Sequence, residues 1–193
     1  MPLFIAGLVL FFGVHSVSIV AEPWRNRMVA RIGEMRWQGL YSLVAVVGFA
    51  LIVLGYDGAR HASPVLYRPP LWTHYITLVL LLPVFPLLIA AYLPGRIQAA
   101  TRHPMLLAVM FWAAGHLVAT GTVIDVVLFA VFLAWAVVDR ISVGLRPLRE
   151  IRHLPAGRMN DAVIVVVGLA MYAAFLGWAH SFFIGVSPLT GLG

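Results

Sequence analysis

The stretch PMLLAVMFWAAGHLVATGTVIDVVLFAVFLAWAVV, residues 104–138, decides how this chain must fold. It is apolar throughout except near residues 120–122 and Asp125. A single membrane-spanning helix needs about 20 residues, so this stretch is too long for one ordinary crossing. Each half is short for a spanning helix, but a tight turn at Gly121 would allow two crossings. We therefore predict a helical hairpin here.

Four further apolar runs are long enough to cross about 30 Å of hydrocarbon at about 1.5 Å per residue. They are Leu3–Val20, Leu40–Tyr56, Leu71–Leu93 and Ala162–Ile184. With the hairpin, they predict an all-α fold, a polytopic integral membrane helical bundle with six transmembrane helices. We expect residues 1–193 to form one domain. The composition agrees, because 62% of residues are hydrophobic and only 10% are charged, against roughly 25% charged in soluble domains.

The first apolar run has no basic residue before it and no small-residue cleavage site after it. We therefore expect a retained helix rather than a cleaved signal peptide. The chain contains no cysteine. This composition excludes disulfides, thiolate metal sites, thiol nucleophiles and covalently attached c-type haem.

Arginine placement tests the six-helix interpretation independently, because basic residues concentrate in cytoplasmic loops. Four, two and five arginines fall in the loops after the first, third and fifth spans, including Arg149 and Arg152, whereas only Arg60 and Arg68 fall on the opposite side. A single crossing through residues 104–138 would remove this imbalance. We therefore predict a protein of the bacterial inner membrane with both termini periplasmic. The net charge of +6 follows this orientation and does not indicate nucleic-acid binding.

The seven histidines are informative because ionisable groups inside a membrane are costly and usually functional. His61 and His153 fall in predicted loops, where we expect them to be solvated. The others fall in or beside the predicted spans: His15 in the first, His74 near the outer start of the third, His103 and His116 in the fourth, and His180 in the sixth.

Histidine ligation of haem iron is the plainest metal hypothesis for this chain, because it has neither thiolates nor an embedded carboxylate cluster. A neutral imidazole offers one lone pair to a metal while its other nitrogen donates a proton to a carbonyl. His116 shares its helix face with Trp112 and Ala113, a bulky wall beside a small residue that could admit a flat ring. The alternative explanation for His116 is ordinary helix packing.

The sequence Arg102-His103-Pro104 predicts an anion site at the entrance of the fourth span. A proline in the first helical turn leaves backbone donors free, and Arg102 beside it, or Arg96, could hold a propionate or carboxylate. His103 and His116 project roughly 140° apart on one helix, so they should serve different purposes.

Two features near the fifth span have simpler interpretations. We expect Asp139-Arg140 to end that helix, with Arg140 acting as an interfacial anchor. Asp125 is expected to be a helix-start residue.

Several motifs, in order and spacing over nearly the whole chain, resemble the NnrU family. They are Phe12-Gly13-Val14-His15-Ser16, Gly39-Leu40-Tyr41-Ser42-Leu43, Pro94-Gly95-Arg96-Ile97, Arg102-His103-Pro104-Met105, Gly115-His116-Leu117 and Ala134-Trp135-Ala136-Val137-Val138-Asp139-Arg140-Ile141-Ser142. The family is named for an association with nitric oxide and nitrite metabolism. It is similar to the cis-zeta-carotene isomerase of plastids and cyanobacteria, an integral membrane enzyme that uses haem b.

The resemblance implies haem b with His15 and His116 as axial ligands. From the residues themselves we expect Arg102 or Arg96 to be the propionate partner, and His103 to lie beside the cofactor. Ala113 stands where the plant enzyme offers an alternate cysteine ligand. Depth counting gives a different partner for His116, because His180 and His74 lie nearer to its level than His15. Both possibilities remain open.

Three function classes follow. The first is haem-dependent chemistry on a hydrophobic polyene or a small gas ligand. The second is a membrane methyltransferase of the isoprenylcysteine type that uses S-adenosylmethionine at Arg102 and His103. The third is a non-catalytic assembly factor for respiratory enzymes.

Overall fold

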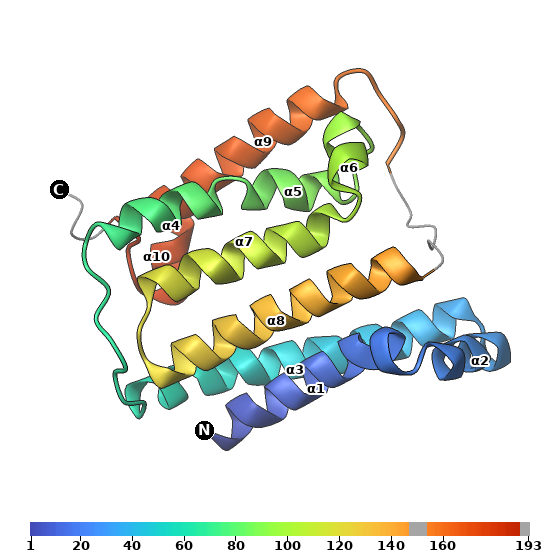
Figure 1. Ribbon diagram of the computed structural model, residues 1–193, viewed down its shortest axis with the longest axis horizontal. Helices are drawn as coiled ribbons and strands as arrows, with labels where there is room; N and C mark the ends of the chain where they lie inside the picture. The colour runs from blue at the N-terminus through green and yellow to red at the C-terminus, as the bar shows by residue number, and fades with distance from the viewer. Residues whose placement is uncertain (147–153, 190–193) are drawn as a thin grey trace. The chain divides into compact units, whose positions relative to one another are not determined.

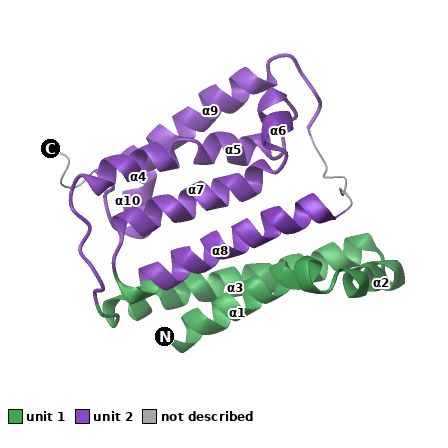
Figure 2. Cartoon of the chain, in the orientation of Figure 1, with its two compact units in different colours: residues 1–64, 122–124 green, residues 65–121, 125–193 purple. Residues whose placement is uncertain are grey.

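The structure is a computed structural model that describes residues 1–146 and 154–189. His153, Arg149 and Arg152 lie outside the described residues. The chain divides into two compact units, which Figure 2 shows in different colours. Unit 1 comprises residues 1–64 and 122–124, and unit 2 comprises the described parts of residues 65–121 and 125–193.

Helices account for most of the described chain (Figure 1). Unit 1 contains α1 (Pro2–Val20), α2 (Glu22–Ile32) and α3 (Glu34–His61). Unit 2 contains α4 (Thr73–Leu81), α5 (Val84–Ala90), α6 (Arg96–Thr101), α7 (Pro104–Ala119), α9 (Asn160–Ala174), the π-helical turn η1 (Phe175–Ala179) and α10 (His180–Ile184). The remaining helix, α8 (Val123–Leu145), begins in unit 1 and continues in unit 2.

The predicted all-α membrane fold is confirmed. In the part of the chain that the structure describes, five segments are long and apolar enough to cross a membrane, namely α1, α3, residues 73–90, α8 and residues 160–184. The predicted count of six is approximate, because α7 is apolar but has only 16 residues, about 24 Å of helix. The apolar outer faces of these helices fit a lipid bilayer.

The turn between α7 and α8 contains Gly121, the position at which the sequence predicts the hairpin to turn. The carbonyl oxygen of Gly121 accepts hydrogen bonds from the backbone N–H groups of Leu66 and Tyr67, at 2.8 and 3.3 Å. A Cβ at position 121 would overlap the carbonyl of Tyr67. Only glycine fits this close approach of two backbone segments.

Three local predictions need correction. The chain between α1 and α3 contains the helix α2, whose polar sequence is invisible to a search for apolar runs. The prediction that His61 lies in a loop is wrong, because it is the last residue of α3 and its Nδ1 lies 2.9 Å from the carbonyl oxygen of Asp57. The fifth span does not end at Asp139-Arg140, because α8 continues to Leu145. Helical hydrogen bonding continues past the point where the apolar run stops.

Unit 1 is built on a close contact between α1 and α3 at three glycines. A Cβ on Gly7 would come 2.5 Å from the backbone nitrogen of Ile52, and one on Gly48 would come 2.7 Å from that of Phe11. A Cβ on Gly55 would overlap the backbone of Phe4, which is completely buried. Small residues let two membrane helices approach closely and gain van der Waals contact.

Unit 2 has its core where α4 and α5 meet α7. Val84, Leu87 and Ala108 are buried there. The helix over residues 73–90 is interrupted at Pro83, because proline lacks the backbone N–H that would continue the helical hydrogen bonding. Neighbouring side chains bond to backbone oxygens near this break: Tyr172 donates to the carbonyl of Leu78 at 2.9 Å, and Thr77 donates to that of Gly115 at 3.0 Å.

The carboxylate of Asp161, in the first turn of α9, caps the start of α6. Its two oxygens accept hydrogen bonds from the backbone N–H groups of Arg96 and Ile97, and both N···O distances are 3.1 Å. A Cβ on Gly95 would overlap this carboxylate. Asn160 adds a 2.7 Å hydrogen bond to the carbonyl of Pro94. The Pro94-Gly95-Arg96-Ile97 motif therefore serves as the docking point of α9 on α6.

Substituting Asp161 by alanine should destabilise the protein. The loss of a capping side chain costs about 1 kcal/mol, which corresponds to a fall of about 2–4 °C in the thermal unfolding midpoint for a chain of this length. The measurement is the unfolding midpoint of the detergent-solubilised protein.

A double-substitution cycle provides the control for this effect. Gly95→Ala alone should also destabilise the protein, because its methyl group displaces the carboxylate. In the Asp161→Ala background the same glycine substitution should cost little more. Strictly additive effects would contradict the proposed contact.

Candidate functional site

His116 lies in the last turn of α7 and has a fixed ring orientation. Its Nδ1 lies 2.8 Å from the carbonyl oxygen of Trp112, one turn earlier. A carbonyl oxygen only accepts hydrogen bonds, so Nδ1 carries the proton and the lone pair is on Nε2. This tautomer presents Nε2 as a potential metal ligand.

The ring of His116 belongs to an aromatic cluster between α7 and α8 within unit 2. It stacks on Phe129, with ring centroids 4.7 Å apart and an interplanar angle of 23°. The ring of Trp112 lies 5.2 Å from it and also makes edge contacts with Phe129 and Phe132. The predicted shared face of Trp112 and His116 is confirmed. Ala113 is completely buried, so its methyl group packs against neighbouring atoms.

His15, in α1 of unit 1, has a closely similar local arrangement. Its Nδ1 lies 2.6 Å from the carbonyl oxygen of Phe11, again one turn earlier. The Phe11 ring lies 4.1 Å from the imidazole, and Tyr41 of α3 makes an edge contact at 5.2 Å. The same reasoning leaves the lone pair on Nε2.

His15 and His116 therefore share one design, an imidazole whose Nδ1 bonds to the carbonyl of an aromatic residue four positions earlier. Both rings are half-buried, and their donor atoms suit the axial coordination of haem iron. The structure places His15 in unit 1 and His116 in unit 2.

His74 and His180 lie where they were predicted, His74 near the start of α4 and His180 at the start of α10. Their Nδ1 atoms lie 3.2 and 2.6 Å from the carbonyl oxygens of Leu71 and Val186. A bonded Nδ1 therefore does not by itself distinguish a ligand. His180 belongs to the same unit as His116 and lies within electrostatic range of it, as does the buried Asp125 in the first turn of α8.

The start of α7 carries a group of charged side chains within unit 2. Pro104 occupies the first helical turn, as predicted, and His103 is the N-cap residue. Arg102 is exposed, with a backbone φ of 59°, a left-handed conformation that is uncommon outside glycine. Arg102 and His103 therefore both lie directly before α7.

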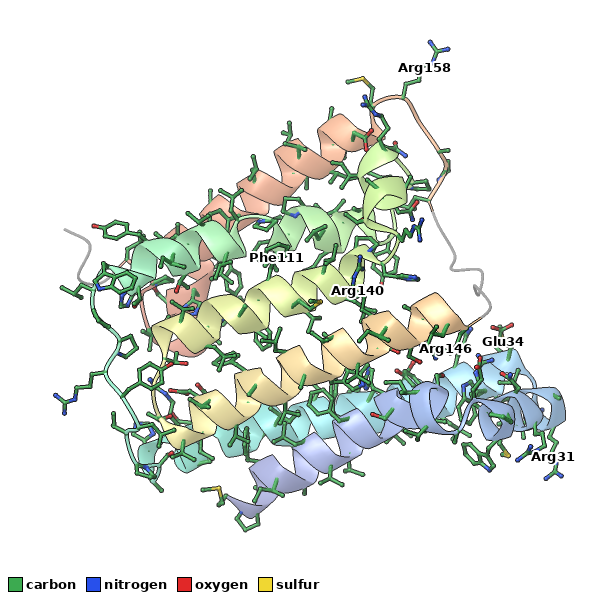
Figure 3. All side chains as sticks on the ribbon, viewed as in Figure 1. Arg31, Glu34, Phe111, Arg140, Arg146 and Arg158 are labelled. Atoms are coloured by element: carbon green, nitrogen blue, oxygen red, sulfur yellow. The ribbon has the colours of Figure 1, made fainter. Side chains whose placement is uncertain are left out.

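Arg140 joins this group from α8 and has more than an anchoring role. Both terminal nitrogens of its guanidinium lie 3.4 Å from the carbonyl oxygen of Thr101 (Figure 3). Directly after the end of α8, Arg146 pairs with Asp139 at 2.7 Å, with both side chains largely buried. No apolar pattern in the sequence reveals that α8 brings a second arginine to His103.

Arg96 is the first residue of α6. Its backbone N–H bonds to Asp161, and its side chain is exposed at the opposite end of α6 from Arg102. The contact with Asp161 fixes the backbone at Arg96, and the expectation that its side chain binds a propionate stays a prediction.

His103 has a lowered pKa for an identifiable reason. It precedes α7, and partial burial is the largest cause that lowers its pKa from the ordinary value of 6.5. The positive charge of Arg140 adds to the effect, and Asp139 opposes it. The imidazole of His103 is therefore neutral at pH 7.

The stability of the protein should fall as the pH drops below about 6.5, partly through His103. In that range the unfolded chain binds a proton at position 103 before the folded chain does, so protonation favours unfolding. The His103→Gln variant should lose less stability than the parent between pH 7 and pH 5.5. Thermal unfolding midpoints measure the effect, which we expect to be at most a few degrees.

An NMR titration provides the direct check. The imidazole signal that disappears in His103→Gln should titrate below pH 6.5 in the folded parent, and Arg140→Gln should raise that value. A titration at or above 6.5 would contradict the placement of His103 among the arginines.

Among known proteins, one family matches this chain. The family model described as NnrU protein covers residues 3–188. No curated protein and no solved structure matches the chain.

Proposed function

The chain belongs to the NnrU family, and from this premise we propose that it is a haem b-binding protein of the bacterial inner membrane, with His15 and His116 as the axial ligands. The observation that carries the proposal is the geometry that these two histidines share. Each has its Nδ1 on a backbone carbonyl, which puts the imidazole lone pair on Nε2, and each lies beside aromatic rings.

The residues around these histidines have distinct tasks in the proposal. The carbonyls of Phe11 and Trp112 hold the imidazoles in the ligating tautomer and add basicity to Nε2. Aromatic side chains exclude water from the ring that carries the lone pair. When bound, haem b supplies an iron centre for either double-bond isomerisation of a hydrophobic polyene or redox and nitric oxide chemistry.

Arg102 and His103 are the proposed partners of a propionate. Arg102 is exposed at the start of α7, where free backbone N–H groups also favour an anion. His103 is neutral and can donate one hydrogen bond. Arg140 adds positive charge nearby. Arg96 is the weaker candidate, because its side chain lies at the other end of α6.

The orientation proposed for the chain has both termini in the periplasm. The support is the distribution of arginines, which places Arg25, Arg27, Arg31 and Arg36 after α1 and leaves Arg60 and Arg68 on the other side.

The visible absorption spectrum of the membrane-extracted protein tests the proposed function. We expect a Soret band and a low-spin b-type spectrum, as two histidine ligands produce. A protein that remains colourless after expression with ample haem would overturn the proposal.

The same charged group at the start of α7 supports a second candidate, a methyltransferase that binds the carboxylate of S-adenosylmethionine at Arg102 and His103. A colourless protein whose unfolding midpoint rises with S-adenosylmethionine would favour this function. A colourless protein that S-adenosylmethionine does not stabilise would leave the assembly-factor interpretation.

A further inference from the structure

We infer that α2 and the first turn of α3 form a binding surface for the headgroups of anionic phospholipids. This surface, here called the interfacial patch, consists of Trp24, Arg27, Arg31, Met35 and Arg36. All five residues are exposed. The inference depends on the membrane placement of α1 and α3, and it is independent of the proposed haem.

The position of α2 follows from the lengths of its neighbours. The 19 residues of α1 span about 28 Å, close to the thickness of the hydrocarbon layer. Only Ala21 separates α1 from α2. The 28 residues of α3 span about 42 Å, so α3 extends roughly 12 Å beyond the hydrocarbon. Its apolar run begins at Leu40, which leaves the polar first turn, and α2 beside it, at the level of the headgroups.

One face of α2 packs against α1 and α3, and the opposite face is exposed. Met28, Val29 and Ile32 are partly buried, and α2 contacts both α1 and α3. At about 100° per residue, Trp24, Arg27 and Arg31 fall within an arc of roughly 60°. Figure 3 shows Arg31 pointing away from the helices of unit 1.

Trp24 has a defined position in this surface. Its ring makes an edge contact with Trp37 of α3, with centroids 5.7 Å apart, and the side chain is 44% exposed. Tryptophan is enriched at the membrane interface, where its ring lies among the headgroups. Met35, at the start of α3, adds an exposed apolar side chain. Contact with lipid is more favourable for such a side chain than contact with water.

The charge of the segment selects an anionic partner. Residues 22–36 carry Arg25, Arg27, Arg31 and Arg36 against Glu22 and Glu34, so the net charge is positive. A guanidinium forms paired hydrogen bonds to phosphate oxygens. Basic segments beside a membrane helix are attracted to anionic lipid. Because arginines, tryptophan and methionine share one exposed surface at the membrane level, a lipid headgroup fits better than a soluble anion.

The absence of cysteine from the sequence allows a local measurement on the full chain. Ala30, exposed on α2, is replaced by cysteine and labelled with a nitrobenzoxadiazole fluorophore. The labelled protein is placed in nanodiscs of phosphatidylcholine with equal amounts of either doxyl-phosphatidylglycerol or doxyl-phosphatidylcholine. Quenching by the two lipids is compared at low and high salt.

We expect phosphatidylglycerol to quench at least about twofold more strongly than phosphatidylcholine at low salt, and the difference to shrink at high salt. Arg27→Gln with Arg31→Gln should remove the preference. The matched control, Arg68→Gln with Arg158→Gln, changes two exposed arginines of unit 2 and should retain it.

Three results would overturn the inference. One is equal quenching by the two lipids in the parent, and another is a preference that survives the double substitution on α2. The third is the lack of quenching by either lipid, which would place α2 away from the bilayer.

Discussion

The His116→Ala variant should lose the low-spin b-type spectrum or convert it to a high-spin one. Alanine removes the Nε2 lone pair that the carbonyl of Trp112 orients, so the proposed haem would be held by one histidine fewer. The measurement is the absorption spectrum of the oxidised and reduced protein after extraction, together with the haem content per chain.

The matched control for this variant is His74→Ala. His74 is a half-buried histidine in the same unit, and its Nδ1 also bonds to a backbone carbonyl. Its replacement should leave the spectrum unchanged. A comparison of elution profiles and helical circular dichroism separates ligand loss from unfolding. An unchanged low-spin spectrum in His116→Ala would remove this residue from the ligand set.

The His15→Ala variant should likewise lose the low-spin spectrum, whereas His180→Ala should keep it. His15 has the same bond to an aromatic residue one turn earlier as His116, and the family resemblance assigns it the second axial position. His180 bonds instead to the carbonyl of Val186, on its C-terminal side. Spectra of the two single variants, recorded side by side, decide between them.

The comparison of His15→Ala with His180→Ala matters because the depths of the histidines in the membrane favour His180 as the partner of His116. His180 shares unit 2 with His116 and lies within electrostatic range of it, which is the arrangement that counting from the membrane surface favours. If His15→Ala retains the low-spin spectrum and His180→Ala loses it, the ligand carried over from the family is wrong.

The membrane fold could be predicted because a lipid bilayer constrains sequence strongly. Each backbone polar group must bond within its own segment, so apolar length translates directly into spanning helices. The turn at Gly121 was predictable for the same reason, since the apolar run exceeded one crossing. The polar helices α2 and α6 carry no such signal, and the helical end of α8 extends beyond the apolar residues that mark its span.

The candidate site was predictable in its residue types and less so in its contacts. The spacing of four between Trp112 and His116 indicates a shared face, and the bond from Nδ1 to the carbonyl follows from helix geometry. The approach of Arg140 to Thr101 joins residues 39 apart, and Asp161 caps a helix that begins 65 residues earlier. Such pairings depend on how helices pack, which periodicity along one segment does not encode.

The glycine contact between α1 and α3 also bears on how the protein is made. Both helices lie within the first 61 residues, so their interface can form while the rest of the chain is still being synthesised. Contacts between neighbouring segments cost little loop-closure entropy, which favours early formation. A helix pair that is already joined enters the membrane as a unit with its backbone groups satisfied. The pair of α1 and α3 would then be in place before the later helices leave the ribosome.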